Sequence, residues 1–249
     1  MGVPTPPARC RYPIVLLHGL FGFVEISFGP LKLAYFRGVA PYLEAVGNRV
    51  IPIRVHSRQT IAFRANQIKE AIDFHPVLHD SPLNLVAHSM GGLDSRFLIT
   101  HLGYGRRVRS LTTISTPHHG SFLADILGVV PGARRWAPAV SDLGEKAAER
   151  FNRKTPDWPE THYFSIPAKT RFIQCCPFLW IPYFILVLRS GPNDGQVPLS
   201  SSRWGEVLEE AEADHIQLLG MRYGLNAFRR WRHLDLYGRI SHVLAAHGC

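Results

Sequence analysis

Ser89 lies in a sequence context that gives a serine hydroxyl a chemical role. The apolar run at residues 83–87 predicts a buried strand, and the periodic stretch at 90–102 predicts a helix. Ser89 would then occupy a tight strand-to-helix turn, with the small residues Ala87 and Gly91 two positions before and after it. This pattern is typical of a nucleophile elbow, in which a strained backbone presents the serine oxygen to a substrate.

Two later loops offer the acid and the base that such a serine requires. A serine hydroxyl is a weak nucleophile at neutral pH, so it needs a base within hydrogen-bond reach and an acid to orient that base. Asp194 lies in an Asn-Asp-Gly turn, and His215 follows a predicted strand at 206–208. Taken alone, each is more often a turn or structural residue. The order Ser, Asp, His on loops that follow strands favours Asp194 as the acid and His215 as the base.

Other titratable residues fit these roles less well. His88 is adjacent to Ser89, and neighbouring side chains diverge at a tight turn, so we expect His88 to pack inside the elbow. Asp214 is adjacent to His215 and is too constrained to orient its ring. His242 and His247 fall on a predicted C-terminal helix and are expected at the surface.

Attack by a serine also requires backbone N–H groups aimed where negative charge develops on the attacked oxygen. Met90, at the start of the predicted helix, supplies one candidate donor. Leu20, in the turn after a predicted strand at 12–17, supplies the other. A His-Gly pair after a strand is otherwise an ordinary turn, but together with the elbow it favours an oxyanion hole.

Strands and helices alternate along the first half of the chain. The predicted strands are 12–17, 50–54, 83–87, 108–115, 163–166 and 206–208, and the predicted helices are 36–46, 61–74, 90–102, 123–130 and 225–246. This alternation predicts an α/β fold with a mostly parallel central sheet flanked by helices. Such sheets bind ligands beyond the carboxyl ends of their strands, where Ser89 and Leu20 fall.

A length of 249 residues fits one α/β domain with a full core. No internal repeat or linker divides the chain, so we expect a single domain over 1–249. The alternation weakens at about 118–160, and 173–188 is apolar enough to be a strand, a buried helix or a lid. We therefore expect 118–160 and 171–190 to be lid or cap-like insertions, with a small lid.

The net charge of +9 is carried mainly by scattered arginines. No Lys/Arg run with interleaved aromatic residues is present, so the sequence predicts a basic surface and no nucleic-acid partner. The start of the chain lacks the apolar core of a signal peptide, which leaves a cytoplasmic protein and a processed secreted form open. The apolar segment at 173–188 is short and contains Pro177 and Pro182, so no transmembrane span is expected.

The four cysteines, Cys10, Cys175, Cys176 and Cys249, show no metal-type spacing. Cys175 and Cys176 are adjacent in an apolar segment, which predicts that at least one is a buried thiol. A disulfide that involves Cys10 or Cys249 is left open.

Four segments together resemble the bacterial triacylglycerol lipases of the Pseudomonas/Burkholderia type, within the α/β-hydrolase superfamily. They are Tyr12-Pro-Ile-Val-Leu-Leu-His-Gly-Leu20, Ala87-His-Ser-Met-Gly-Gly92, Thr113-Ile-Ser-Thr-Pro-His-His-Gly-Ser121, and Asn193-Asp-Gly-Gln-Val197 with Ser200-Ser201 and Asp214-His215 beyond it. They occur in the family order and span most of the chain. The Ala87 form of the elbow is similar to that of small Bacillus lipases.

The resemblance implies Ser89 as nucleophile, Asp194 as acid, His215 as base, and Leu20 and Met90 as oxyanion donors. It assigns no role to the histidines of the Thr-Pro-His-His segment. The family's calcium site has an Asp two residues after the catalytic His, where this chain has Gln217. An amide is a weaker ligand than a carboxylate for Ca²⁺, so we expect no metal site of that kind. The family's usual half-cystine after the acid is also missing, and the shorter chain implies a reduced lid.

The sequence therefore predicts a serine carboxylic ester hydrolase, a lipase or esterase, that acts through an acyl-enzyme without a cofactor. A polyester hydrolase or an acyltransferase on the same triad, and a non-catalytic binding protein of the same fold, are the alternatives. We expect a monomer that binds small-molecule or lipid esters, with a lipid–water interface as one setting. The candidate acyl-pocket or lid residues, which ordinary core packing explains equally well, are Phe21, Phe23, Leu123, Ile126 and Leu127.

Overall fold

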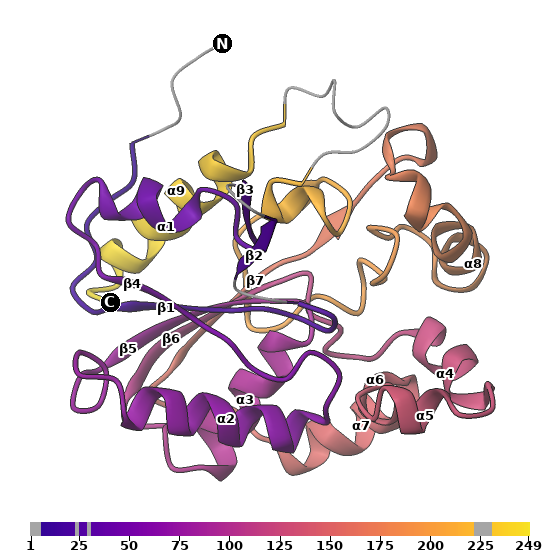
Figure 1. Ribbon diagram of the computed structural model, residues 1–249, viewed down its shortest axis with the longest axis horizontal. Helices are drawn as coiled ribbons and strands as arrows, with labels where there is room; N and C mark the ends of the chain where they lie inside the picture. The colour runs from indigo at the N-terminus through magenta and orange to yellow at the C-terminus, as the bar shows by residue number, and fades with distance from the viewer. Residues whose placement is uncertain (1–5, 23–24, 29–30, 222–230) are drawn as a thin grey trace.

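The apolar runs form one six-stranded, all-parallel sheet in the computed structural model, which describes residues 6–22, 25–28, 31–221 and 231–249 (Figure 1). The strand order is β4-β1-β5-β6-β7-β9. The strands are β1 (Ile14–Leu17), β4 (Val50–Ile53), β5 (Leu83–His88), β6 (Val108–Ile114), β7 (His162–Ile166) and β9 (Glu206–Val207). The predicted parallel sheet is confirmed, with strand ends within a few residues of those expected.

Helices cover both faces of the sheet, which explains why the strands are continuously apolar. Alternate side chains of β1 enter different cores: Ile14 and Leu16 join one, and Val15 and Leu17 join the other. The first core lies under α1 (Val39–Glu44) and α9 (His233–Ala246), and the second under α2 (Ile61–Asp73) and α3 (Gly91–His101) (Figure 1). Helices on both faces of a parallel sheet confirm the predicted α/β class.

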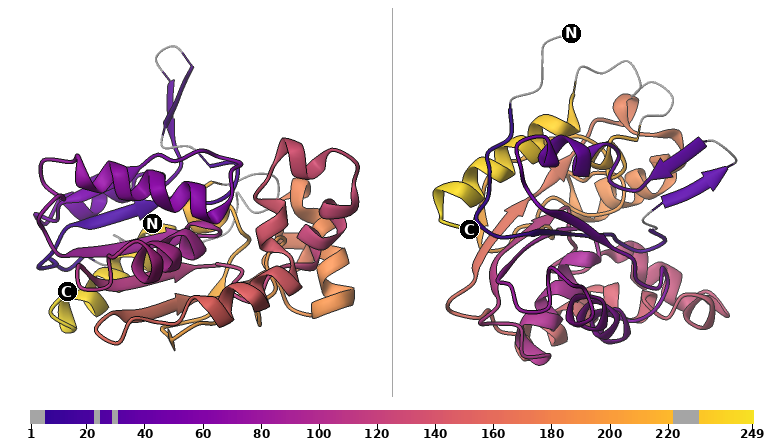
Figure 2. Two further views of the ribbon diagram at one scale, coloured as in Figure 1. Left: turned by 90° about the horizontal axis from the view of Figure 1, so that it is seen from below. Right: turned by 60° about the vertical axis from the view of Figure 1, so that its left-hand side comes forward.

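The segments expected as insertions form a group of helices at one end of the sheet, seen from two directions in Figures 1 and 2. These helices are α4 (Phe122–Val129), α5 (Ala133–Trp136), α6 (Val140–Leu143), α7 (Glu145–Lys154) and α8 (Trp180–Ser190). Two short 3₁₀ turns, η1 (Phe172–Gln174) and η2 (Pro177–Leu179), precede α8. The ambiguous apolar stretch is therefore helical over its second half.

Several elements differ from the sequence-based expectation. A hairpin of β2 (Glu25–Phe28) and β3 (Leu31–Ala34) projects from the body, and β8 (Ala168–Lys169) pairs with β10 (Ala211–Glu212) (Figure 2). The two-residue strands β8 and β10 are too short to show a period in the sequence, and the four-residue strands β2 and β3 lack the continuous apolar run of β1. A third 3₁₀ turn, η3 (Gln217–Leu219), follows His215. The predicted C-terminal helix begins at His233, and its expected part at 225–230 lies outside the described residues.

Within the described residues, no helix is long and apolar enough to cross a membrane.

Candidate active site

Ser89 occupies a strained turn between β5 and α3. Its φ is 55°, a left-handed value that is rare for a residue with a side chain. The turn is fixed on both sides, since the Ser89 N–H donates to Ile114 O at 2.9 Å and the Ser89 carbonyl accepts from the Thr116 hydroxyl at 2.7 Å. The nucleophile-elbow geometry expected from the sequence is therefore present.

Small residues around the turn allow the close approach of neighbouring backbone. A Cβ at Gly91 would lie 2.8 Å from Leu17 O, and one at Gly19 would lie 2.6 Å from the Ser89 Cβ. Ala87, at the position where a glycine is more usual, is completely buried. The end of β1 consequently passes directly beside Ser89.

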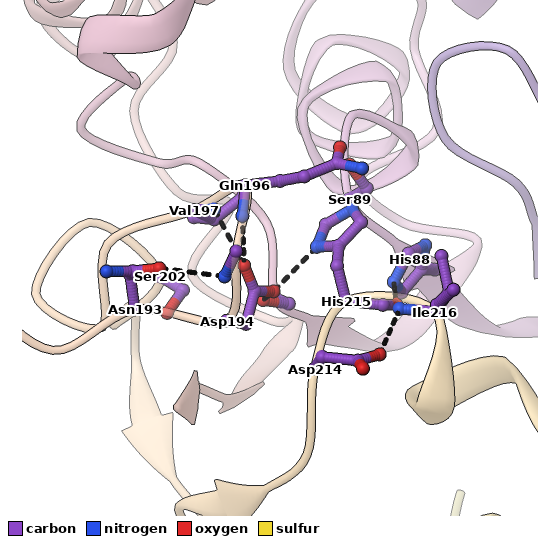
Figure 3. A network of polar contacts seen from close by, with 12 residues as sticks. His88, Ser89, Asn193, Asp194, Gln196, Val197, Ser202, Asp214, His215 and Ile216 are labelled. Atoms are coloured by element: carbon purple, nitrogen blue, oxygen red, sulfur yellow. Dashed lines mark hydrogen bonds and ion pairs between the residues drawn. The ribbon is translucent and has the colours of Figure 1, made fainter. Parts of the chain in front are cut away.

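Asp194 is completely buried and is held by four donors (Figure 3). Its Oδ1 accepts from the Gln196 and Val197 N–H groups at 2.8 and 2.7 Å. Its Oδ2 accepts from the Ser115 hydroxyl and from His215 Nδ1, the latter at 2.6 Å. These bonds fix the direction of the carboxylate and leave it aimed at the imidazole ring.

His215 lies with Asp194 on one side of its ring and Ser89 on the other in the view of Figure 3. The ring is 5% exposed, and its backbone N–H donates to Asp194 O at 2.9 Å. Because Asp194 accepts from Nδ1, the other ring nitrogen, Nε2, is left as the basic atom. The structure thus brings the three predicted catalytic side chains into one place.

Asp214, the neighbouring acid, has a different role. Its Oδ1 accepts from the Ile216 and Gln217 N–H groups at 3.1 and 2.8 Å, and its Oδ2 accepts from the Cys176 N–H at 2.9 Å. These contacts hold the turn that carries His215 and do not reach its ring, as the sequence argument expected.

The two candidate oxyanion donors, Leu20 and Met90, lie on neighbouring loops and pack in one small apolar cluster. Met90 precedes the first turn of α3, where backbone N–H groups point out of the helix. Within the described part of the chain, neither N–H group has a hydrogen-bond acceptor. Both are consequently available to a ligand oxygen.

Arg64 supports the Leu20 loop and was not identified from the sequence. Its guanidinium is completely buried, donates to His18 O at 2.7 Å and Gly19 O at 3.3 Å, and pairs with Asp94 at 2.8 Å. Arg64 interrupts the apolar stripe of α2, three residues after Ile61 and four before Ile68. A charged residue within an apolar helix face was the signal that could have revealed it.

The candidate acyl-pocket residues have unequal positions. Phe21 is 50% exposed and its ring centroid lies 5.3 Å from that of Trp136. Ile126 and Leu127, on α4, are 36% and 48% exposed, and Leu123 is half-buried. Phe23 lies outside the described residues. The described members therefore line the surface next to α4 and α5 and do not belong to the sheet cores.

The calcium site implied by the family resemblance does not fit the residues present. Gln217 stands where that site would have a carboxylate, and its side-chain oxygen accepts from the Asp214 N–H at 3.0 Å. In the described part of the chain, no group of three His, Cys, Asp or Glu residues could hold a metal ion. All four cysteines are free and buried, so the thiols of Cys175 and Cys176 are both buried.

Three buried histidines are held neutral by their surroundings. Burial, reinforced by the Arg64 charge, lowers the pKa of His18 to about 4. Burial also lowers the pKa of His88 and His118 well below the usual range, with further contributions from His215 and Arg96 respectively. His18 Nε2 accepts from the Val55 N–H at 3.2 Å, which requires an unprotonated nitrogen.

These histidines predict that the protein loses stability in mild acid. Between pH 6.5 and 4 these histidines bind protons in the unfolded chain but not in the folded one. The free energy of unfolding therefore decreases as the pH is lowered. Burial raises the pKa of Asp94 to about 7 and also raises that of Asp142. The folded chain therefore binds protons at these two carboxyl groups, which offsets part of the extra protons that the unfolded chain binds at its histidines. We expect a loss of roughly 1 to 3 kcal/mol between pH 6.5 and 5.5, because each net proton changes the free energy of unfolding by about 1.4 kcal/mol per pH unit. Urea unfolding at these pH values measures it, and constant or rising stability would contradict it.

Known proteins with similar sequences include triacylglycerol lipases. The chain is 33% identical to triacylglycerol lipase 2 of Saccharomyces cerevisiae, over 88% of this chain and 83% of the yeast protein. It is 34% identical to the triacylglycerol lipase of Pseudomonas fragi over 49% of this chain and 41% of that protein, and 33% identical to that of Vibrio cholerae over 49% and 38%. No family model matches the sequence.

Solved structures with the same fold include a metagenomic carboxyl esterase and the Staphylococcus hyicus lipase. The esterase superimposes with a TM-score of 0.80 at 19% identity and covers 99% of this chain and 79% of the esterase. The lipase superimposes with a TM-score of 0.77 at 16% identity, over 99% of this chain and 97% of the lipase. Identities this low establish similarity of fold.

Proposed function

The chain belongs to the triacylglycerol lipase family, with an α/β-hydrolase fold and the activity of a carboxylic ester hydrolase, and from this premise we propose that Ser89, His215 and Asp194 are its catalytic triad. The observation that carries the proposal is the 2.6 Å contact from His215 Nδ1 to Asp194 Oδ2, on a ring whose other side faces Ser89 in the view of Figure 3. The contact orients the base and stabilises the positive charge that it acquires.

In the acylation step, His215 Nε2 removes the hydroxyl proton of Ser89 as the oxygen attacks the ester carbonyl. The carbonyl oxygen becomes an oxyanion, which accepts hydrogen bonds from the N–H groups of Leu20 and Met90. When the tetrahedral intermediate collapses, the bond to the alcohol oxygen breaks and His215 gives that oxygen its proton. The acyl group remains on Ser89.

In the deacylation step, water takes the place of the alcohol. His215 removes a proton from the water, the oxyanion forms again on the same two N–H groups, and the carboxylic acid leaves as Ser89 regains its proton. His215 accepts and then returns each proton that moves in the cycle, so the cycle needs no cofactor.

We further propose that the chain forms one domain in which 118–160 and 171–190 cover the site and contact lipid. Twelve of the fifteen large hydrophobic side chains exposed in the described residues lie between Ile126 and Leu188. On α8, Ile181, Phe184 and Leu188 are 76%, 47% and 88% exposed and follow at intervals of three and four residues, so they share one helix face. A group of exposed apolar side chains on neighbouring helices favours a lipid ester at a lipid–water interface as substrate.

Activity on soluble and emulsified esters tests this proposal. We expect the wild-type protein to hydrolyse both p-nitrophenyl butyrate in solution and an emulsified triacylglycerol. Leu188→Glu should lower the rate on the emulsion about tenfold or more, because burial of a leucine in an apolar phase contributes about 1.5–3 kcal/mol. Its kcat/KM on the soluble ester should stay within about twofold, since the Leu188 side chain lies in solvent.

Phe74→Glu is the matched control, because it places the same charge on another exposed side chain. Phe74 is 87% exposed and lies at the end of α2, away from the helices of the cover. A loss on the emulsion shared by both variants would contradict the role of α8. Absence of hydrolysis of either ester by the wild-type protein would contradict the proposed function itself.

A further inference from the structure

A line of hydrogen bonds runs behind the triad, from the Leu20 loop to the backbone of His215. The Gly19 N–H donates to the Tyr35 hydroxyl at 3.2 Å, and that hydroxyl lies 2.9 Å from His88 Nδ1. His88 Nε2 lies 3.1 Å from His215 O. Gly19, Tyr35, His88 and His215 are all buried. None of these contacts involves the reacting atoms, yet the line ends at both halves of the active site.

The chemistry of the end groups fixes the direction of every bond in this line. A backbone N–H can only donate and a carbonyl can only accept. Nε2 of His88 must therefore carry a proton for His215 O, and because burial keeps this ring neutral, Nδ1 is left as an acceptor. The Tyr35 hydroxyl then accepts from Gly19 and donates its own proton to Nδ1. Burial raises the pKa of Tyr35 to about 12, so the hydroxyl keeps that proton.

The rings of His88 and His215 are close enough for their charges to matter. Their centroids are 4.5 Å apart, and His215 becomes a cation each time it takes the Ser89 proton. A second cation on His88 would oppose that step. Burial and the neighbouring His215 keep the pKa of His88 low, so His88 stays neutral when His215 takes the proton.

We propose that Tyr35 and His88 are positioning residues that fix the carbonyl of His215 and the peptide before Leu20, through a single neutral tautomer of His88. The inference rests on the proposed role of His215 as the base. His215 is then held on both sides, since its N–H donates to Asp194 O and its carbonyl accepts from His88. The Tyr35 hydroxyl accepts from the Gly19 N–H, one residue before the Leu20 N–H that is proposed to bind the oxyanion.

Tyr35→Phe tests the proposal because it removes only the hydroxyl. We expect kcat on p-nitrophenyl butyrate to fall about tenfold with KM within about twofold, since the ester does not contact Tyr35. Nitrogen-15 NMR of the ring nitrogens should show His88 as the Nε2–H tautomer in the wild-type protein and as a mixture in the variant. Tyr237→Phe is the control: its hydroxyl is equally buried in the same core and has no hydrogen-bond partner in the described part of the chain.

Substitutions of His88 test the other half of the line and do not depend on how Tyr35→Phe folds. His88→Gln keeps an amide donor for His215 O, whereas His88→Leu has none, so we expect the Gln variant to retain at least about tenfold more activity. Equal kcat in Tyr35→Phe and Tyr237→Phe, or equal activity in the two His88 variants, would overturn the proposal. The tautomer of His88 is measured without turnover, so a wrong assignment of the base would abolish the kcat effects and leave the NMR result intact.

Discussion

Ser89→Ala should lower kcat/KM for ester hydrolysis by about 10⁵ to 10⁶-fold, the loss that follows when a triad nucleophile is removed. Without the hydroxyl there is no acyl-enzyme, and the remaining oxyanion donors only assist attack by water. The fold should be unaffected, because the bonds that hold the turn come from the backbone N–H and carbonyl of residue 89. The measurement is the hydrolysis of p-nitrophenyl butyrate by both proteins, with thermal melting to compare their stability.

Covalent labelling identifies the nucleophile independently of turnover. A p-nitrophenyl alkylphosphonate should add one phosphonyl group to the wild-type protein, on the peptide that contains Ser89, and none to Ser89→Ala. Ser141→Ala, which changes an exposed serine on α6, should be labelled and active like the wild type. A phosphonyl group on another peptide, or activity of Ser89→Ala within tenfold of the wild type, would show that another residue is the nucleophile.

Asp194→Asn should reduce kcat by about 10⁴-fold through the tautomer of His215. An amide has one oxygen, and the carboxylate it replaces accepts from two N–H groups at Oδ1 and from His215 and Ser115 at Oδ2. The two N–H groups retain the oxygen, so the NH₂ group faces His215 Nδ1. The proton of the ring then moves to Nε2, which can no longer act as the base.

Asp214→Asn separates this effect from a general disturbance of the loop. Asp214 accepts from the backbone N–H groups of Ile216, Gln217 and Cys176 and so holds the turn, and we expect its amide to cost about tenfold at most. Steady-state kinetics of both variants on one soluble ester make the comparison. A mild effect of Asp194→Asn, or a larger effect of Asp214→Asn, would mean that Asp194 is not the acid.

The apolar segment at 173–188 is the part of the chain whose structure the sequence predicts least. Residues 173–188 are apolar throughout, and an apolar run of this length fits a strand, a buried helix or a lid equally well. The structure places a helix there whose residues Ile181 and Leu188 face outward. Which side of such a segment is covered depends on the elements beside it, and a local pattern carries no information about them.

Side chains that support the site were missed for a related reason. His88 was expected to pack inside the elbow, and it is buried there, but its bonds to Tyr35 and His215 join residues 53 and 127 positions away. Arg64 supports a loop 45 residues before it. Contacts over such separations exist only once the sheet has brought its strand ends together.

The sequence by itself predicted the parallel α/β sheet and the candidate triad. Both predictions use the residue pattern of each strand and turn and the order of these segments along the chain. A strand buried on both faces must be apolar at every position, as in Ile14–Leu17. A serine between small residues at a strand end is typical of a nucleophile elbow. Only the tertiary structure decided how Asp194 and His215 are held and which apolar side chains remain in solvent. Hydrogen-bond geometry and exposure are properties of neighbours in space, and the chain acquires those neighbours only by folding.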